Sequence, residues 1–188
     1  DQASRAPAIG GTWRFAALSF ALTLLLAYPL TLAPAGRVLA DGPDTRLFMW
    51  TLAWDTHAFT QQPLSIFDAN IYYPERHTLA YSENLIGSAL IAAPILWLTD
   101  NPVLAMNVVA LLSSMLCGLG AFVLARRLGM GPPAAALCGI IFAFSPPRFF
   151  RLSQLHLTTI QWVPFGLASL HAYFDRGRKS DLRLALAF

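Results

Sequence analysis

The run from Val103 to Ala125 constrains this chain more than any other segment, because no charged residue or histidine interrupts it. A helix needs about 20 mostly apolar residues to cross the hydrocarbon core of a membrane. Backbone groups inside lipid must be hydrogen-bonded within the protein, which leaves helices and closed barrels as spanning structures. The run is followed by Arg126 and Arg127, a basic flank typical of a cytoplasmic helix end. It therefore predicts a membrane-spanning helix.

Further apolar runs indicate several such helices. Apolar residues make up 56% of the 188 residues and charged residues 12%, whereas an average soluble domain has about 25% charged residues. We expect an all-α fold, a polytopic transmembrane helix bundle with a large extracytoplasmic loop that carries amphipathic juxtamembrane helices. The expected spans are about 12–34, 103–125, 130–147 and 158–174, with the start of another at 182. Because the chain opens at Asp1 without a methionine and stops at Phe188 inside that last run, we expect residues 1–188 to be the N-terminal part of a single transmembrane domain.

Basic residues beside the apolar runs indicate the orientation. The net charge of +3 would also suit nucleic acid, but most of the Lys and Arg residues flank apolar runs, as the positive-inside rule describes. We therefore expect a lipid bilayer as partner and no nucleic acid. The flanking residues are Arg5, Arg14, Arg126, Arg127, Arg176, Arg178, Lys179 and Arg183. If they are cytoplasmic, the loop at about 35–100 is extracytoplasmic.

The segment 85–98 is the ambiguous part of that loop. It is apolar but short for a span, and Pro94 interrupts it. The totals of Lys and Arg on each side do not separate a crossing helix from a non-crossing one. Because Arg14 abuts the first span while the basic residues of the long loop count for less, we favour an interfacial or re-entrant helix.

Titratable residues gather in the same loop. The stretch 41–83 holds six of the ten carboxylates and two of the four histidines of the chain. A second helix is expected at about 44–60, with one stripe toward the membrane and the opposite stripe toward water or a bound head group. The membrane stripe is Leu47, Trp50, Trp54 and Ala58; the opposite stripe is Asp44, Phe48, Thr51 and Asp55.

Several of these side chains could carry the chemistry. Asp41 and Asp44 are candidate catalytic residues, because a partly desolvated carboxylate is a good general base. Asp41 could equally be a solvated turn residue, and Asp44 stands where a helix N-cap would. Asp55 and His57 are second candidates, which we assign to substrate binding; their i, i+2 spacing does not make a dyad.

Two more polar patches could bind substrate. The loop 67–77 mixes acidic, amide and aromatic side chains, a mixture that suits saccharide recognition but also an ordinary surface loop; its candidates are Asp68, Asn70, Tyr72 and Glu75, with Glu83 beyond it. The patch Arg148, Arg151 and His156, with Gln154 between them, could hold a phosphate or anchor lipid head groups.

No sequence motif specifies a cofactor. Nucleotide-binding, HExxH and CxxC signatures are absent, and Cys117 and Cys138 fall inside apolar runs, where a thiol is usually a packing residue. The sequence therefore specifies no particular cofactor, although the loop carboxylates could bind a divalent cation.

Local strings resemble the GT-C superfamily of membrane glycosyltransferases, in particular large bacterial membrane proteins of that group. They are the segments 67–74, 78–83, 142–146 and 161–164, together with a first span followed by a long loop with Asp41 and Asp44. The resemblance implies a hexosyl or pentosyl transferase of the bacterial inner membrane. Its donor would be a polyprenyl-phosphate sugar and its acceptor an extracytoplasmic glycan, lipid or protein. A first-loop aspartate would be the base of an inverting transfer; here that favours Asp41.

The alternative is a non-enzymatic transporter or a scaffold for envelope polysaccharide assembly. A transporter usually places ionisable residues in mid-membrane. The runs 15–32, 103–125 and 133–147 carry none, which favours a function on the loop.

Overall fold

The computed structural model describes residues 9–38, 41–81 and 83–188, and within them the protein is all-α, with no strand. This confirms the all-α prediction. Arg5, one of the expected cytoplasmic flanks, lies outside the described residues. The chain divides into two compact units, each of which is discontinuous in sequence. The first extends to Leu26 and continues in Leu112–Phe150 and Ile160–Phe188; the second is Ala27–Leu111 with Arg151–Thr159.

The first unit is built around apolar helix contacts. Its helices are α1 (Ile9–Leu26), the later part of α4 (Pro102–Arg127), α5 (Pro132–Phe144), α6 (Pro146–Phe149), α8 (Trp162–Arg176) and α9 (Lys179–Ala187). Phe15 of α1 stacks on Phe122 of α4 with ring centroids 4.5 Å apart. Ala125 and Ala135 are buried in the same cluster. Stacked rings and small side chains thus hold α1, α4 and α5 together.

Glycines let these helices approach closely. A Cβ on Gly139 of α5 would lie 2.7 Å from the carbonyl oxygen of Gly118 in α4 and would also collide with the Phe15 ring. A Cβ on Gly118 would lie 2.8 Å from Ser19 Oγ, and that hydroxyl donates a hydrogen bond to the carbonyl of Met115. Small residues at helix contacts are typical of membrane proteins, where close backbone packing drives association.

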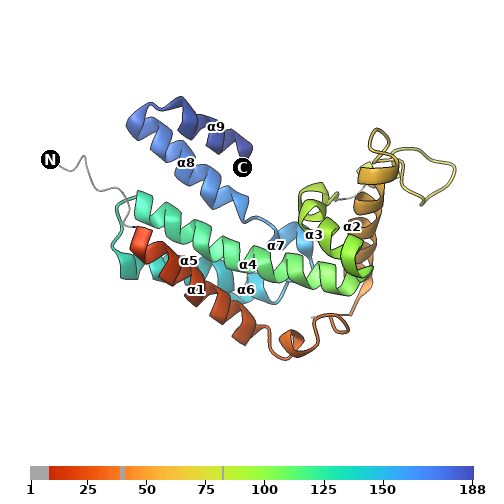
Figure 1. Cartoon of the computed structure of the whole chain (residues 1–188), viewed down its shortest axis with the longest axis horizontal. Helices are drawn as coiled ribbons and strands as arrows, with labels where there is room; N and C mark the ends of the chain where they lie inside the picture. Colours follow the sequence, from red (N-terminus) through yellow and green to blue (C-terminus); the bar gives the residue numbers. More distant parts are fainter. Residues whose placement is uncertain (1–8, 39–40, 82) are drawn as a thin grey trace. The chain divides into compact units, whose positions relative to one another are not determined.

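The second unit contains the long polar segment. Its elements are η1 (Leu30–Leu32), α2 (Pro43–Gln61), η2 (Thr78–Tyr81), α3 (Ile86–Thr99), the first turns of α4 and α7 (Leu155–Thr158). The expected helices at 44–60 and 85–98 correspond to α2 and α3 within two residues. Gly42 precedes α2 and Pro43 occupies its first helical position, where the missing N–H costs nothing. α2 packs against α3 (Figure 1).

Two asparagines, Asn101 just before α4 and Asn107 within it, hold the segment that leads into this unit. Asn101 accepts a hydrogen bond from the backbone N–H of Leu104, which caps the first turn of α4. Its amide donates to the carbonyl of Ala35. Asn107 donates to the carbonyls of Pro34 and Arg37, both at 2.7 Å. Residues 34–37 are therefore fixed by side chains far along the chain.

Several helices are shorter than the expected spans, and prolines explain the difference. α1 ends at Leu26 rather than near 34, because Pro29 has no N–H for a helical bond. α5 stops at Phe144, just before Ser145 and Pro146. α8 starts at Trp162 rather than 158, since Pro164 cannot donate to a preceding turn. Within the described residues α4 is the one helix long and apolar enough to cross a membrane, and half of its apolar window is buried.

Candidate functional site

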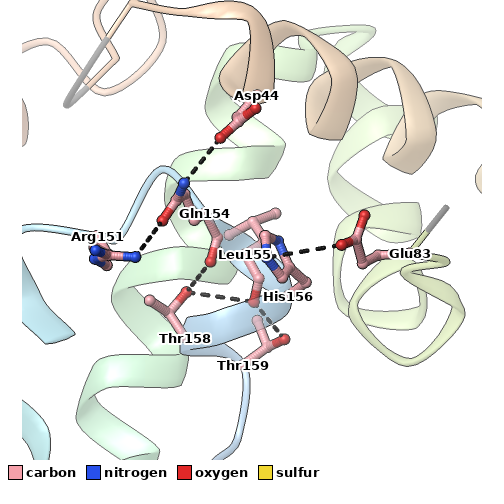
Figure 2. Close-up of polar contacts among 8 residues, drawn as sticks. All are labelled: Asp44, Glu83, Arg151, Gln154, Leu155, His156, Thr158 and Thr159. Atoms are coloured by element: carbon pink, nitrogen blue, oxygen red, sulfur yellow. Dashed lines mark hydrogen bonds and ion pairs between the residues drawn. The ribbon is translucent and has the colours of Figure 1, made fainter.

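A cluster of polar side chains forms in the second unit, where the segment around α7 meets the N-terminal half of α2. Figure 2 shows its members, here called the Asp44 cluster: Asp44, Glu83, Arg151, Gln154 and His156. Gln154 Nε2 donates a 2.8 Å hydrogen bond to Asp44 Oδ2, joining residues 110 positions apart in the sequence. On its other side Gln154 Oε1 accepts from Arg151 Nη1 at 3.4 Å. An amide thus links a carboxylate to a guanidinium.

The imidazole of His156 forms the second arm of the cluster. Its Nε2 lies 4.0 Å from Glu83 Oε1, and its ring lies 4.9 Å from the ring of Phe48 on α2. His156 Nδ1 is buried and has no hydrogen-bond partner among the described residues. The imidazole is therefore fixed mainly by packing, with one carboxylate at the edge of ion-pair distance.

The backbone of α7 is held from within. The hydroxyl of Thr159 donates to the carbonyl of Leu155 at 2.7 Å, and the hydroxyl of Thr158 lies at longer distances from the carbonyls of Gln154 and Leu155 (Figure 2). The Leu152 and Leu155 side chains are buried. These contacts give Gln154 and His156 a fixed base.

Asp44 does not cap α2, so the N-cap interpretation is wrong. Gly42 stands at the N-cap, no side chain caps the helix, and Asp44 lies in the first turn. Pro43 takes the first helical position and shifts Asp44 one step inside the helix. A carboxylate there still benefits from the positive end of the helix dipole. Asp44 Oδ2 is engaged by Gln154, whereas Oδ1 has no partner among the described residues.

Asp41 is held differently. Both of its carboxylate oxygens accept from the guanidinium of Arg46 at 3.2 to 3.3 Å. The two side chains are 69% and 70% exposed, so this is a surface ion pair of the kind that contributes about 0 to 1 kcal/mol. Of the two candidate bases, Asp44 alone has a contact with the α7 segment.

Asp55 is buried, and the prediction that its stripe faces water is wrong. Asp55 is 0% exposed, and Phe48 and Thr51 of the same stripe are also buried. The reason is tertiary packing, because α3 packs against α2 and the backbone of Leu85, just before α3, lies at Asp55. Neither Asp55 oxygen has a hydrogen bond of normal geometry to the part of the chain that the structure describes. Burial raises the pKa of Asp55 to about 6, against a smaller opposing effect of the Leu85 backbone N–H.

Side chains of the stripe of α2 that was expected to face the membrane also make contacts within the protein. Trp54 Nε1 donates to the carbonyl of Ile66 at 2.8 Å, and Ala58 is buried. The ring of His57 lies 5.9 Å from the ring of Trp54. These contacts place His57 beside Trp54 rather than in the Asp44 cluster.

The loop after α2 contains four of the predicted substrate-binding residues, one with a structural role and three that are exposed. Asp68 Oδ1 accepts from the backbone N–H of His77 at 2.8 Å and lies 3.1 Å from its Nδ1. Asp68 therefore closes the loop. Asn70, Tyr72 and Glu75 are exposed and available to a ligand.

Arg148 belongs to the first unit and contacts α4. Its Nη2 donates to Cys117 Sγ at 2.9 Å, and its Cζ lies 5.4 Å from the centroid of the Phe142 ring. Cys117 is fully buried, as expected of a packing residue, but it also accepts this charged hydrogen bond. Sequence reasoning missed the contact of Cys117 with Arg148 and that of Gln154 with Asp44. A local sequence pattern does not indicate a partner many residues away.

No group of three or more His, Cys, Asp or Glu side chains that could hold a metal ion occurs in the part of the chain that the structure describes. Comparisons with protein-family models, with curated proteins and with solved structures find no match to this chain.

Proposed function

We propose that this chain is a membrane glycosyltransferase of the GT-C kind, which moves a sugar from a polyprenyl-phosphate donor to an extracytoplasmic acceptor with inversion. The observation that carries the proposal is the Asp44 cluster. It combines a carboxylate with one unoccupied oxygen, a guanidinium and an imidazole in the unit that holds the long polar segment. A displacement at a sugar–phosphate bond requires a proton acceptor and a cation near the leaving phosphate.

Apolar side chains exposed on the first unit support a membrane location. They come from α1, α5 and α8: Trp13, Phe20, Leu25, Leu137, Ile141, Val163, Leu167 and Phe174. Exposure of these side chains to water is unfavourable, because removing apolar surface from water stabilises a protein by about 25 cal/mol for each Å². α4, at 26 residues, is about 39 Å long and exceeds the roughly 30 Å hydrocarbon core. α3, at 14 residues, is about 21 Å long, which favours the interfacial placement of the segment 85–98.

The proposed reaction is a single displacement. Asp44 Oδ1 accepts the proton of an acceptor hydroxyl while the hydroxyl oxygen bonds to the anomeric carbon. The bond between that carbon and the phosphate oxygen breaks, and the lipid phosphate leaves with the electron pair. Arg151 stabilises its charge, because a guanidinium pairs well with phosphate oxygens. One displacement inverts the anomeric carbon.

Asp44 is a better candidate for the base than Asp41. Both oxygens of Asp41 already accept from Arg46, whereas Oδ1 of Asp44 has no partner among the described residues. The exposed loop residues Asn70, Tyr72 and Glu75 are proposed to contact the acceptor, because amides and carboxylates bind sugar hydroxyls and aromatic faces stack on sugar rings.

The test is sugar transfer by the protein in proteoliposomes that contain radiolabelled polyprenyl-phosphate hexoses and pentoses. Asp44→Asn is expected to lower turnover at least 100-fold, and Asp41→Asn less than threefold. Asp100→Asn, an exposed carboxylate of the same unit, is the matched control. Wild-type turnover in D44N would overturn the role of Asp44. A transporter or scaffold would leave the labelled donor unconsumed in every variant, including the wild type.

A further inference from the structure

We infer that Gln154 is a positioning residue that holds the carboxylate of Asp44 in one orientation, with Oδ2 engaged and Oδ1 free. The contact stands on the geometry alone. Its catalytic consequence rests on the proposed function, in which Asp44 is the base.

The two neighbours of the Gln154 amide fix which way it points. Its NH₂ group faces the Asp44 carboxylate, and its oxygen faces the guanidinium of Arg151 (Figure 2). A flipped amide would put its oxygen against a carboxylate and its donors against a cation. Because a carboxylate only accepts and a guanidinium only donates, one orientation of Gln154 satisfies both neighbours.

The main chain of Gln154 is fixed as well. Its N–H donates to the carbonyl of Arg151 at 2.8 Å, and its carbonyl accepts from the backbone N–H of Leu157 at 3.0 Å. The buried side chains of Leu152 and Leu155 lie on either side of it in the sequence. The amide therefore reaches Asp44 from a rigid base, and α2 supplies a second rigid base for the carboxylate.

A restrained carboxylate matters because proton transfer depends on geometry. Asp44 is in the exposed first turn of α2, where a free side chain would sample several rotamers. The hydrogen bond from Gln154 selects the rotamers that place Oδ2 at the amide. Loss of this restraint is expected to lower kcat about tenfold to a hundredfold with KM within twofold, since the acceptor is still bound but the base is misplaced.

Two variants and one control test the inference in the full-length chain. Gln154→Met keeps the length and removes the hydrogen bond, and Gln154→Glu puts a second carboxylate against Asp44. Gln61→Met is the matched control, because Gln61 is exposed in the last turn of α2, and among the described residues its side chain bonds only to Thr60. Labelling of Asp44 by a water-soluble carbodiimide, which reacts with protonated carboxyls, is followed by mass spectrometry from pH 4 to pH 8 in detergent.

In Q154E the labelling of Asp44 is expected to persist to higher pH than in the wild type, because a like charge disfavours the ionised form. Q61M should follow the wild type. Identical profiles in Q154E and Q61M would overturn the inference, whether or not sugar is transferred. Shifted profiles together with full transfer by D44N would leave the Gln154 contact standing and reject the proposed function of Asp44.

Discussion

Trp54 on α2 donates a 2.8 Å hydrogen bond from Nε1 to the carbonyl of Ile66 in the following loop. This bond ties the beginning of the loop to the helix it leaves. Further along, Thr78 Oγ1 donates to the carbonyl of Ala69. The loop that exposes Asn70 and Tyr72 is thus attached at both ends.

Replacing Trp54 with Phe should loosen this loop. The indole donor is lost while an aromatic ring stays, and one intramolecular hydrogen bond contributes about 1 kcal/mol. Amide hydrogen exchange over residues 62–77 is expected to accelerate about fivefold. Trp50→Phe is the control, because the ring of Trp50 also stacks near Trp54. Equal exchange in both variants would show that the Ile66 bond does not hold the loop.

Asp55 predicts a pH dependence of stability. Its pKa is raised from 3.8 to about 6, and α3 brings no titratable side chain against it. Unfolding releases the carboxyl to its ordinary pKa, so the unfolded state loses its proton first as the pH rises. The stabilising contribution of protonated Asp55 is present below about pH 4 and is lost as the pH rises through about 6, a total of about 3 kcal/mol.

Asp55→Asn removes this titration and is expected to be more stable than the wild type at pH 7 and similar to it at pH 4. Thermal unfolding in detergent across this range measures the difference. Asp100→Asn, at an exposed position, should keep the wild-type profile. A D55N profile parallel to that of the wild type would show that Asp55 titrates normally in the folded protein.

Gly139→Ala should destabilise the first unit. The added Cβ would meet the Phe15 ring and the Gly118 carbonyl, and overpacking of this kind costs about 1 to 3 kcal/mol. Gly11→Ala is the matched control, since no atom of the described residues lies within 4 Å of a Cβ there and alanine is the better helix former. Thermal unfolding of the two variants should shift in opposite directions; a neutral G139A would mean that α5 can move away from α4.

Asn107→Leu should free the segment 34–37. The substitution removes both hydrogen bonds to the carbonyls of Pro34 and Arg37, and an intramolecular hydrogen bond contributes about 1 kcal/mol. Limited proteolysis near Arg37 is expected to become faster. Asn70→Leu, an exposed asparagine of the same unit, should leave that cleavage unchanged, and equal rates in N107L and the wild type would contradict the anchoring role.

Helical segments were predictable from the sequence, because their signals are local. Apolar runs and prolines place α2, α3 and α4 within a few residues. The span expected at 12–34 is too long, because α1 ends at Leu26, before Pro29. Local signals therefore give element type more securely than element ends.

The candidate site was less predictable, because its contacts join distant segments. Asp44 was found as a candidate, but its bond to Gln154 depends on how α7 meets α2. Asp55 was assigned to the water-facing stripe, since periodicity separates two faces of a helix without saying which one a neighbour will cover. Packing by α3 decided that question.

The discontinuous second unit has a consequence for biosynthesis. Its last piece, Arg151–Thr159, follows all of α4, α5 and α6 in the chain. Asp44 emerges from the ribosome long before Gln154 does, at about 5 to 20 residues per second. A nascent chain halted before residue 151 would carry the long polar segment without the Asp44 cluster, so the site is completed only after the apolar helices between its two halves have been translated.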